Sequence, residues 1–326
     1  MNFRNVFSLL PLTVGVAICG LVTGRDAHSQ LLYVATRGDN AITAFTPSGA
    51  RATFAAAGLD DPYQLAFDKS GNLYAANVFG GNIEKFTPGG AASVFIPVNN
   101  QGYGLPFGLT FDGAGNLYVA TDANLPRGGG GRIEKYSASG ADKGVFATSG
   151  LNTPIGLAFD SFGNLYAAND NGNTIEKFSP TGVDLGIFAA GVQTPTGIAF
   201  DSAGNLYSSS GDNTIRKITP AGNSSIFAHT GLNDPFGLAF DSAGNLFVAN
   251  FLGNNIEKFS PGGVDLGVFA SNLNQPTGLA FGPGTAFPGT GTPEPGAAAL
   301  FAAGSMAGVS LLNRRKRTTP NKRKAI

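Results

Sequence analysis

The fold is decided by a sixteen-residue stretch, residues 235–250, which reads PFGLAFDSAGNLFVAN. Related copies occupy residues 62–77, 106–121, 154–169 and 195–210, and the central aspartate recurs at intervals of 40 to 48 residues, at Asp68, Asp112, Asp160, Asp201 and Asp241. Repeats of this length are typical of propeller blades or of helical arrays. The chain contains 48 Gly and 19 Pro among 326 residues, and both residue types disfavour helices. The sequence therefore favours a β-propeller.

Each repeat divides into four short strands joined by turns. In the copy that starts at residue 154, the first strand is GLAF (156–159) and the second is LYAAN (165–169). The turn between them contains a glycine, which supplies the positive φ that tight turns need. The third and fourth strands are expected at 175–178 and 183–189. Four short strands joined by turns correspond to one propeller blade.

The two ends of the repeat region are incomplete in complementary ways. Residues 32–35 (LYVA) open the region with a second strand that has no first strand. Residues 278–281 (GLAF) close it with a first strand that has no second, third or fourth. One composite blade would complete both ends and leave no large open seam. We therefore predict an all-β, six-bladed β-propeller over residues 30–284, closed by N- and C-terminal strands.

The repeated unit PxGLAFDSxGNLYxANxxxNxIEKFxPxG resembles the NHL repeat from about Leu31 to Phe281. The resemblance implies a six-bladed propeller of a kind that mostly binds proteins and in some cases RNA. Related six-bladed propellers include metal-dependent gluconolactonase-like hydrolases and streptogramin lyases. Because one fold supports several functions, the resemblance leaves the activity open.

Export is expected from the N-terminal segment, residues 1–29. Arg4 precedes an apolar stretch, and Ala27-His28-Ser29 offers small residues at a cleavage site before Gln30, as in a secretory signal peptide. The only cysteine, Cys19, falls inside this segment. The exported chain would therefore be free of disulfides.

A second signal is expected at the C-terminus. A linker (285–292) leads to Pro293-Glu294-Pro295, an apolar run at 296–312, and the basic cluster Arg314-Arg315-Lys316-Arg317, followed by a basic cytoplasmic tail (318–326). The run is just long enough to span a bilayer, and the cations would stay on its cytoplasmic side. The layout of 293–317 resembles a PEP-CTERM sorting signal. That resemblance implies transient membrane anchoring, processing by an exosortase-type enzyme, and delivery to the envelope or extracellular matrix of a Gram-negative-type bacterium.

The charge of the central body argues against nucleic acid as a partner. Between Gln30 and Thr292 there are 12 basic and 19 acidic residues, which give a net charge of −7. Binding to nucleic acid requires a basic surface that neutralises phosphates. The expected partners are instead an unknown extracellular protein or polysaccharide.

Candidate binding residues fall on one face of the predicted ring. The linkers that enter each first strand and the loops between second and third strands share this face, and one repeat carries insertions in both, at 99–104 and 122–131. Variable loops on a rigid scaffold commonly bind ligands. The candidates are Tyr63, Phe79, Tyr103, Phe107, Arg127, Asn169, Phe236, Asn250 and Phe251. A mobile glycine-rich loop without function is the alternative for the insertions, and turn capping is the alternative for the asparagines.

The chain offers few groups for catalysis. His229 is the only histidine after the leader, and the residues that follow the linker prolines (Tyr63, Phe107, Ile155, Thr196, Phe236 and Thr277) include no acid or Asn to ligate a metal. Glu84, Glu134, Glu176 and Glu257 each precede a lysine and are expected to form charge pairs on the surface. We therefore expect no catalytic residue, cofactor or metal. The alternative is an atypical gluconolactonase-like hydrolase or streptogramin-lyase-like enzyme.

The anchor prediction can be tested by fractionation. Removing residues from Thr292 onward should release the protein from the membrane fraction, because the apolar run and its basic stop would be lost. The comparison is with the full chain in a host that has the sorting machinery. Equal distribution of the two forms between membrane and soluble fractions would show that residues 296–312 are no anchor.

Overall fold

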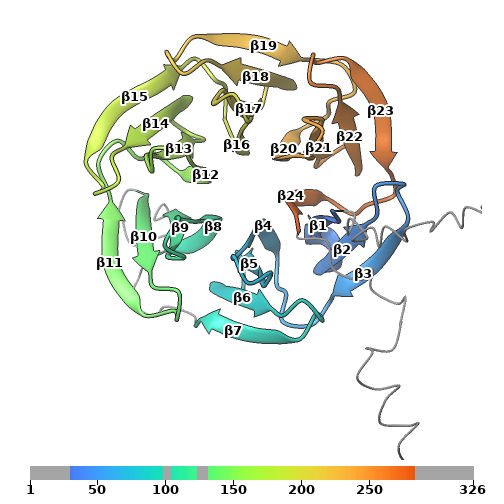
Figure 1. Cartoon of the computed structure of the whole chain (residues 1–326), viewed down its shortest axis with the longest axis horizontal. Coiled ribbons are helices and arrows are strands. Elements are labelled where there is room, and N and C mark those ends of the chain that lie inside the picture. Colours follow the sequence, from blue (N-terminus) through green and yellow to red (C-terminus); the bar gives the residue numbers. More distant parts are fainter. Residues whose placement is uncertain (1–29, 98–103, 123–130, 283–326) are drawn as a thin grey trace, which may run out of the picture.

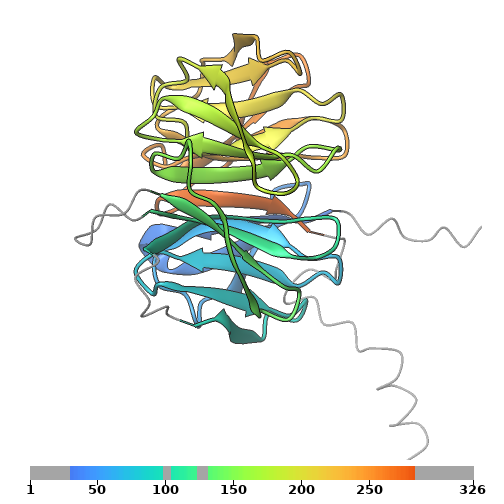
Figure 2. The same cartoon turned by 90° about the vertical axis from the view of Figure 1, so that its left-hand side faces the viewer.

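The computed structural model describes residues 30–97, 104–122 and 131–282, which form six four-stranded sheets around a central axis (Figure 1). All paired strands within a sheet are antiparallel, as illustrated by the pairing of Leu73 with Phe86 and of Tyr74 with Lys85. Viewed from the side, the strands cross the thickness of the ring between its two faces (Figure 2). The predicted six-bladed propeller is therefore confirmed.

Blade 1 combines the two ends of the repeat region. From the centre outward it contains β24 (Pro276–Phe281), β1 (Leu32–Thr36), β2 (Ala41–Phe45) and β3 (Arg51–Ala55) (Figure 1). In the register of the inner pair, Leu32 lies opposite Phe281 and Val34 opposite Leu279. The Gly282 N–H also donates to the Leu31 carbonyl at 2.9 Å. The composite blade predicted from the incomplete repeats is confirmed.

Blades 2 to 6 each consist of four consecutive strands. Blade 2 contains β4 (Pro62–Phe67), β5 (Leu73–Asn77), β6 (Asn82–Phe86) and β7 (Ala92–Ile96), and blade 3 contains β8 (Leu105–Phe111), β9 (Leu117–Asp122), β10 (Arg132–Tyr136) and β11 (Asp142–Ala147). Blade 4 contains β12 (Pro154–Phe159), β13 (Leu165–Asn169), β14 (Thr174–Phe178) and β15 (Asp184–Ala190). Blade 5 contains β16 (Ile198–Phe200), β17 (Leu206–Ser210), β18 (Thr214–Ile218) and β19 (Ser224–Ala228), and blade 6 contains β20 (Pro235–Phe240), β21 (Leu246–Asn250), β22 (Asn255–Phe259) and β23 (Asp265–Ala270). The single helical element of the described residues is a 3-10 turn, η1 (Arg37–Asp39).

Neighbouring blades are joined by an aromatic triad that repeats six times. Its members are a Tyr or Phe from the second strand of one blade, a Phe from that blade's fourth strand, and a Phe from the first strand of the next blade. The Tyr74 ring, for example, meets the rings of Phe95 and Phe111 edge-on, with both centroids 4.9 Å away. The other triads are Tyr33–Phe54–Phe67, Tyr118–Phe146–Phe159, Tyr166–Phe188–Phe200, Tyr207–Phe227–Phe240 and Phe247–Phe269–Phe281. Such edge-to-face contacts stabilise beyond the burial of apolar area.

The turn between first and second strands is built around the repeated aspartate. In blade 2, Asp68 Oδ1 accepts from the backbone N–H groups of Ser70 and Asn72, both at 2.9 Å. Its Oδ2 accepts from Asn72 Nδ2 at 2.8 Å and from the Tyr74 hydroxyl at 3.1 Å. Burial alone would raise the pKa of Asp68, but these hydrogen bonds outweigh it and lower the pKa below its ordinary value. The same turn recurs at Asp112, Asp160, Asp201 and Asp241.

The ring has two distinct faces. We define the front face as the one that carries the linkers into each first strand and the loops between second and third strands. The back face carries the aspartate turns and the turns between third and fourth strands. No helix within the described ranges is both long and apolar enough to cross a membrane. The membrane helix expected at 296–312 lies outside those ranges.

The closure can be tested with two equivalent substitutions. Phe281 and Phe240 hold the same place in their triads, one in the composite blade and the other in blade 6. Phe281→Ala and Phe240→Ala should therefore lower the free energy of unfolding by similar amounts, about 2–4 kcal/mol each. The measurement is urea unfolding followed by circular dichroism. A silent Phe281→Ala beside a costly Phe240→Ala would contradict closure through β24.

Candidate functional site

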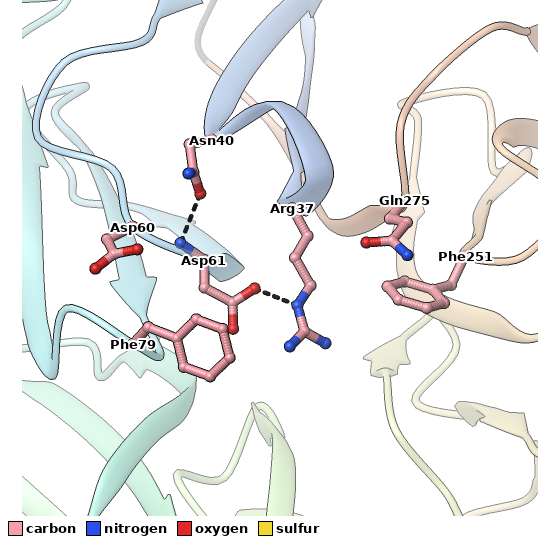
Figure 3. Close-up of a pocket in the computed structure, with 7 residues that line it drawn as sticks. All are labelled: Arg37, Asn40, Asp60, Asp61, Phe79, Phe251 and Gln275. Carbon is pink, nitrogen blue, oxygen red and sulfur yellow. Dashed lines mark hydrogen bonds and ion pairs between the residues drawn. The ribbon is translucent and has the colours of Figure 1, made fainter.

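A pocket of about 410 Å³ opens on the front face where blades 6, 1 and 2 meet (Figure 3). Pockets of this volume accommodate small ligands or single side chains of a partner. Its lining residues come from linkers and from loops between second and third strands: Arg37, Asn40, Asp60, Asp61, Phe79, Phe251 and Gln275. The composite blade therefore supplies part of the site as well as the ring closure.

Arg37 is held at the centre of the pocket by three kinds of contact. It follows β1 directly, and its backbone N–H donates to the Gln275 carbonyl at 3.0 Å. Its Nε donates to Asp61 Oδ1 in an ion pair. The guanidinium carbon lies 5.6 Å from the centroid of Phe79 and 5.9 Å from that of Phe251, so the cation sits between two aromatic rings (Figure 3). Both distances are within the range of cation–π attraction.

Asp61 is held in place by a hydrogen bond from its backbone N–H to an asparagine side chain, and this contact, here called the asparagine latch, recurs around the ring. Asp61 immediately precedes Pro62 and adopts a left-handed conformation with φ of 58°. Its N–H donates to Asn40 Oδ1 at 2.7 Å, and its carbonyl accepts from the Val78 N–H at 3.0 Å. The same asparagine latch joins Asn173 to Thr194, Asn213 to Asp234 and Asn254 to Gln275. Each latch connects a loop of one blade to the linker of the next, so it sets the position of the pre-proline side chain.

The Asp61 carboxylate is buried with one oxygen unused. The residue is 4% exposed, and among the described residues its Oδ2 has no hydrogen-bond partner. Burial raises the pKa of Asp61 above its ordinary value, although Arg37 acts in the opposite direction. A buried acceptor without a partner is costly.

An apolar cluster lies beside the pocket at the front ends of the innermost strands. The Tyr63 ring meets those of Phe107 and Phe236 edge-on, with centroids 5.1 and 5.4 Å away. Val78 and Ile155 are buried in the same cluster. The Phe236 ring lies 5.2 Å from Phe251, which connects this cluster to the pocket wall. Three of the predicted aromatic candidates therefore converge, with Tyr63 buried and Phe107 and Phe236 partly buried.

The two asparagines among the predicted binding residues hydrogen-bond to backbone groups of neighbouring loops. Asn169 and Asn250 are each 1% exposed. The Asn169 side chain donates to the Gly150 carbonyl at 2.7 Å and accepts from the Asn152 N–H at 3.1 Å. Asn250 bonds in the same way to Gly231 and Asn233. Of the two readings that the sequence left open, the geometry matches turn capping.

Tyr103 and Arg127 lie outside the described residues, as do most of the two insertions that contain them. Leu105, which follows the first insertion, pairs with Asp122, the first residue of the second, at the front end of blade 3. Phe79 is 68% exposed and lines the pocket together with Phe251, as expected for residues in loops of the front face.

Acidic side chains nevertheless lie close to the linker prolines on the front face. The residues after the linker prolines do lack acids, but the residues just before them include Asp61 and Asp234, and Asp170 follows the second strand of blade 4. Burial raises the pKa of Asp170, and the charges of Asp122 and Asp234 raise it further. Within the described ranges, these acids do not form a group of three or more potential metal ligands.

The four repeated glutamates are also not on the surface, contrary to expectation. Glu84, Glu134, Glu176 and Glu257 are 3 or 4% exposed. The linker that enters the blade covers the third strand, and at Gly150 an added Cβ would lie 2.7 Å from Asp184 Oδ2 and 2.9 Å from the Glu176 carboxyl carbon. Burial, together with hydrogen bonding to Asp184, raises the pKa of Glu176 to about 7. Burial and Asp265 do the same for Glu257.

The pocket contains residues that our sequence reasoning missed, chiefly Arg37, Asp60 and Asp61. One signal was available: Arg37 is the only cation at the sixth position counted from the first residue of each second strand. The equivalent residues of the other blades are Val78, Asp122, Asp170, Gly211 and Phe251. A residue that departs from its repeat is thus the better guide to the site.

Comparison with solved structures shows the fold. A chain from a nidogen/laminin complex is 21% identical, with a TM-score of 0.68, and the match covers 78% of this chain and 98% of that one. A streptogramin B lyase is 17% identical (TM-score 0.56; 77% and 92% covered), and a putative gluconolactonase is 16% identical (TM-score 0.56; 66% and 80% covered). No protein-family model and no curated protein matches the sequence. At these identities the likeness extends to the six-bladed architecture alone.

The buried glutamates predict a stability that depends on pH. Because the pKa of Glu176 and Glu257 is raised to about 7, the folded state favours their protonated forms. Their contribution to stability is complete below the ordinary Glu pKa of about 4.5 and is lost as the pH rises through about 7. The double variant Glu176→Gln/Glu257→Gln, which keeps a donor toward Asp184 and Asp265, should be more stable than wild type at about pH 8.

The measurement is chemical unfolding of both proteins at about pH 5 and about pH 8. Wild type should lose more stability between the two conditions than the double variant loses. Identical pH dependence would mean that these carboxyls titrate as they do in the unfolded chain.

Proposed function

We propose that this protein is an exported, non-enzymatic binding module that captures a macromolecule, protein or polysaccharide, at the cell envelope or in the extracellular matrix. The observation that carries the proposal is the front-face pocket, in which Arg37 lies between Phe79 and Phe251. Arginine and aromatic side chains are the types enriched at binding hot spots. Phe79 is also 68% exposed, so its ring offers apolar area to a partner.

The proposal includes the cellular address expected from both termini. The leader at 1–29 would direct export, and the PEP-CTERM-like segment at 293–317 would provide a transient membrane anchor and a substrate for an exosortase-type enzyme. The nidogen/laminin structure supports the choice of a binding role, because that propeller-like chain was solved in a complex of two proteins.

Catalysis is the second candidate, since lyase and putative gluconolactonase structures share the fold. His229 lies in the linker between β19 and β20, and within the described ranges no group of three or more His, Cys, Asp or Glu is arranged to hold a metal ion. A streptogramin-lyase-like or lactonase-like reaction needs such a constellation. We therefore place binding before catalysis.

The test compares substitutions on the two faces. The front-face variant is Phe79→Ala/Phe251→Ala, and the back-face control is Ser202→Ala/Ser242→Ala, in two aspartate turns. Immobilised wild type and control should retain material from the matrix fraction of the producing bacterium, whereas the front-face variant should lose at least about nine-tenths of it, as expected for hot-spot residues. Thermal unfolding should show that all three proteins are folded.

Treatment of the matrix fraction identifies the class of partner. Retention abolished by protease indicates a protein, and retention abolished by periodate indicates a polysaccharide.

If the front-face variant retains as much material as wild type, or the back-face variant loses it, the binding face has been assigned wrongly. Turnover of a lactone by the purified wild type would favour the enzymatic candidate.

A further inference from the structure

Two unused hydrogen-bonding groups of opposite kind meet in the front-face pocket. Arg37 Nε donates to Asp61 Oδ1. Within the described ranges, the two terminal nitrogens of Arg37 donate to no protein acceptor. In Figure 3 no interaction is drawn from these nitrogens to any other lining residue. Asp61 Oδ2, on a side chain that is 4% exposed, is an acceptor without a donor. A ligand that fits must therefore offer an acceptor and a donor side by side.

The charge of the pocket selects against a carboxylate. Asp61 balances Arg37, and Asp60, which also lines the pocket, adds a further negative charge. A carboxylate ligand would accept from Arg37 but would face the unpartnered Asp61 oxygen, with like charges in contact. An ammonium group would have the converse defect, because it cannot accept from Arg37. A neutral group with both functions satisfies both residues.

The aromatic rings decide between two neutral groups, a sugar ring and an amide. Sugars bind to aromatic side chains chiefly by stacking against an open ring face. Here the guanidinium lies over Phe79 at 5.6 Å and over Phe251 at 5.9 Å, so the ring faces toward the pocket are already occupied. A planar amide needs no open face, since it can lie end-on to Arg37 and Asp61 with its aliphatic stem against the ring edges.

We propose that the pocket binds the primary carboxamide of an Asn or Gln side chain from a partner protein. The carboxamide oxygen accepts from a terminal nitrogen of Arg37, and the amide nitrogen donates to Asp61 Oδ2. A cavity of about 410 Å³ has room for one such side chain and its neighbouring backbone. The inference rests on the proposed binding function and specifies its chemistry.

The test uses three small probes with similar stems and the full chain. They are N-acetyl-glutamine methylamide, its glutamate counterpart and its methionine counterpart, and a β-glucoside serves as the sugar probe. Saturation-transfer NMR should show the glutamine probe binding at least about tenfold more tightly than the other three. The glutamate and methionine probes leave a buried polar group unpaired, and the glucoside finds no open ring face against which to stack.

Asp61→Asn provides a matched variant that exchanges the preference. Asn tolerates the left-handed backbone at this position, and the latch to Asn40 uses only backbone atoms of residue 61, so the fold should be kept. With Arg37 no longer balanced by Asp61, the glutamate probe should bind more tightly than the glutamine probe. Arg37→Lys is a second variant, which should weaken both probes because the forked donor is lost.

Three results would overturn the amide site. They are glutamate or glucoside binding as tightly as glutamine in wild type, an unchanged preference in folded Asp61→Asn, and no saturable binding of the glutamine probe. If the probes fail while Phe79→Ala/Phe251→Ala still abolishes retention of the natural partner, only the amide inference falls. If Phe79→Ala/Phe251→Ala leaves retention of the natural partner unaffected while wild type binds the glutamine probe, the proposed function is wrong and the amide site remains supported.

Discussion

The six aromatic triads are the contacts on which the rest of the structure depends. Each places a ring of one blade against a ring of the next, as when Tyr74 of blade 2 meets Phe111 of blade 3. Six core clusters are accordingly shared between neighbouring blades, so no blade has a core of its own. The only cysteine, Cys19, precedes the repeat region, which therefore has no disulfide to compensate for an open ring. The last triad, which includes Phe281, is therefore as necessary as the others.

The features that could be predicted from the sequence are those that every repeat shares. The strand boundaries, the aspartate turn and the composite blade all follow from comparing copies of one unit, because each copy reports on the same local structure. Even the incomplete ends are informative, since Leu32 and Phe281 mark the strands that pair. Because the unit repeats, the propeller scaffold can be predicted from the sequence without knowledge of any contact between distant residues.

The features that could not be predicted depend on contacts between units. The burial of Glu176 arises from a linker that precedes it by some twenty-five residues, and a single strand with alternating polar residues does not reveal it. The pocket combines Arg37 with Asp61 and with Phe251, more than 200 residues away along the chain. The asparagine latch that presents Asp61 likewise joins two blades. The residues of this candidate site differ from their counterparts in the other repeats and come from different blades. They therefore form no sequence motif by which the site could have been predicted.

The pairing of Leu32 with Phe281 also fixes how the ring would be mounted. In every other blade this point carries an aspartate turn, so both ends of the propeller leave from the back face of blade 1. If the sorting segment tethers the chain, the tether joins the ring on the face opposite the Arg37 pocket. Drag on a captured partner would then be transmitted to the tether through β24. That strand is the innermost of its blade and is hydrogen-bonded on one side only, to β1. The strength of the β24–β1 pairing therefore sets the mechanical strength of the attachment.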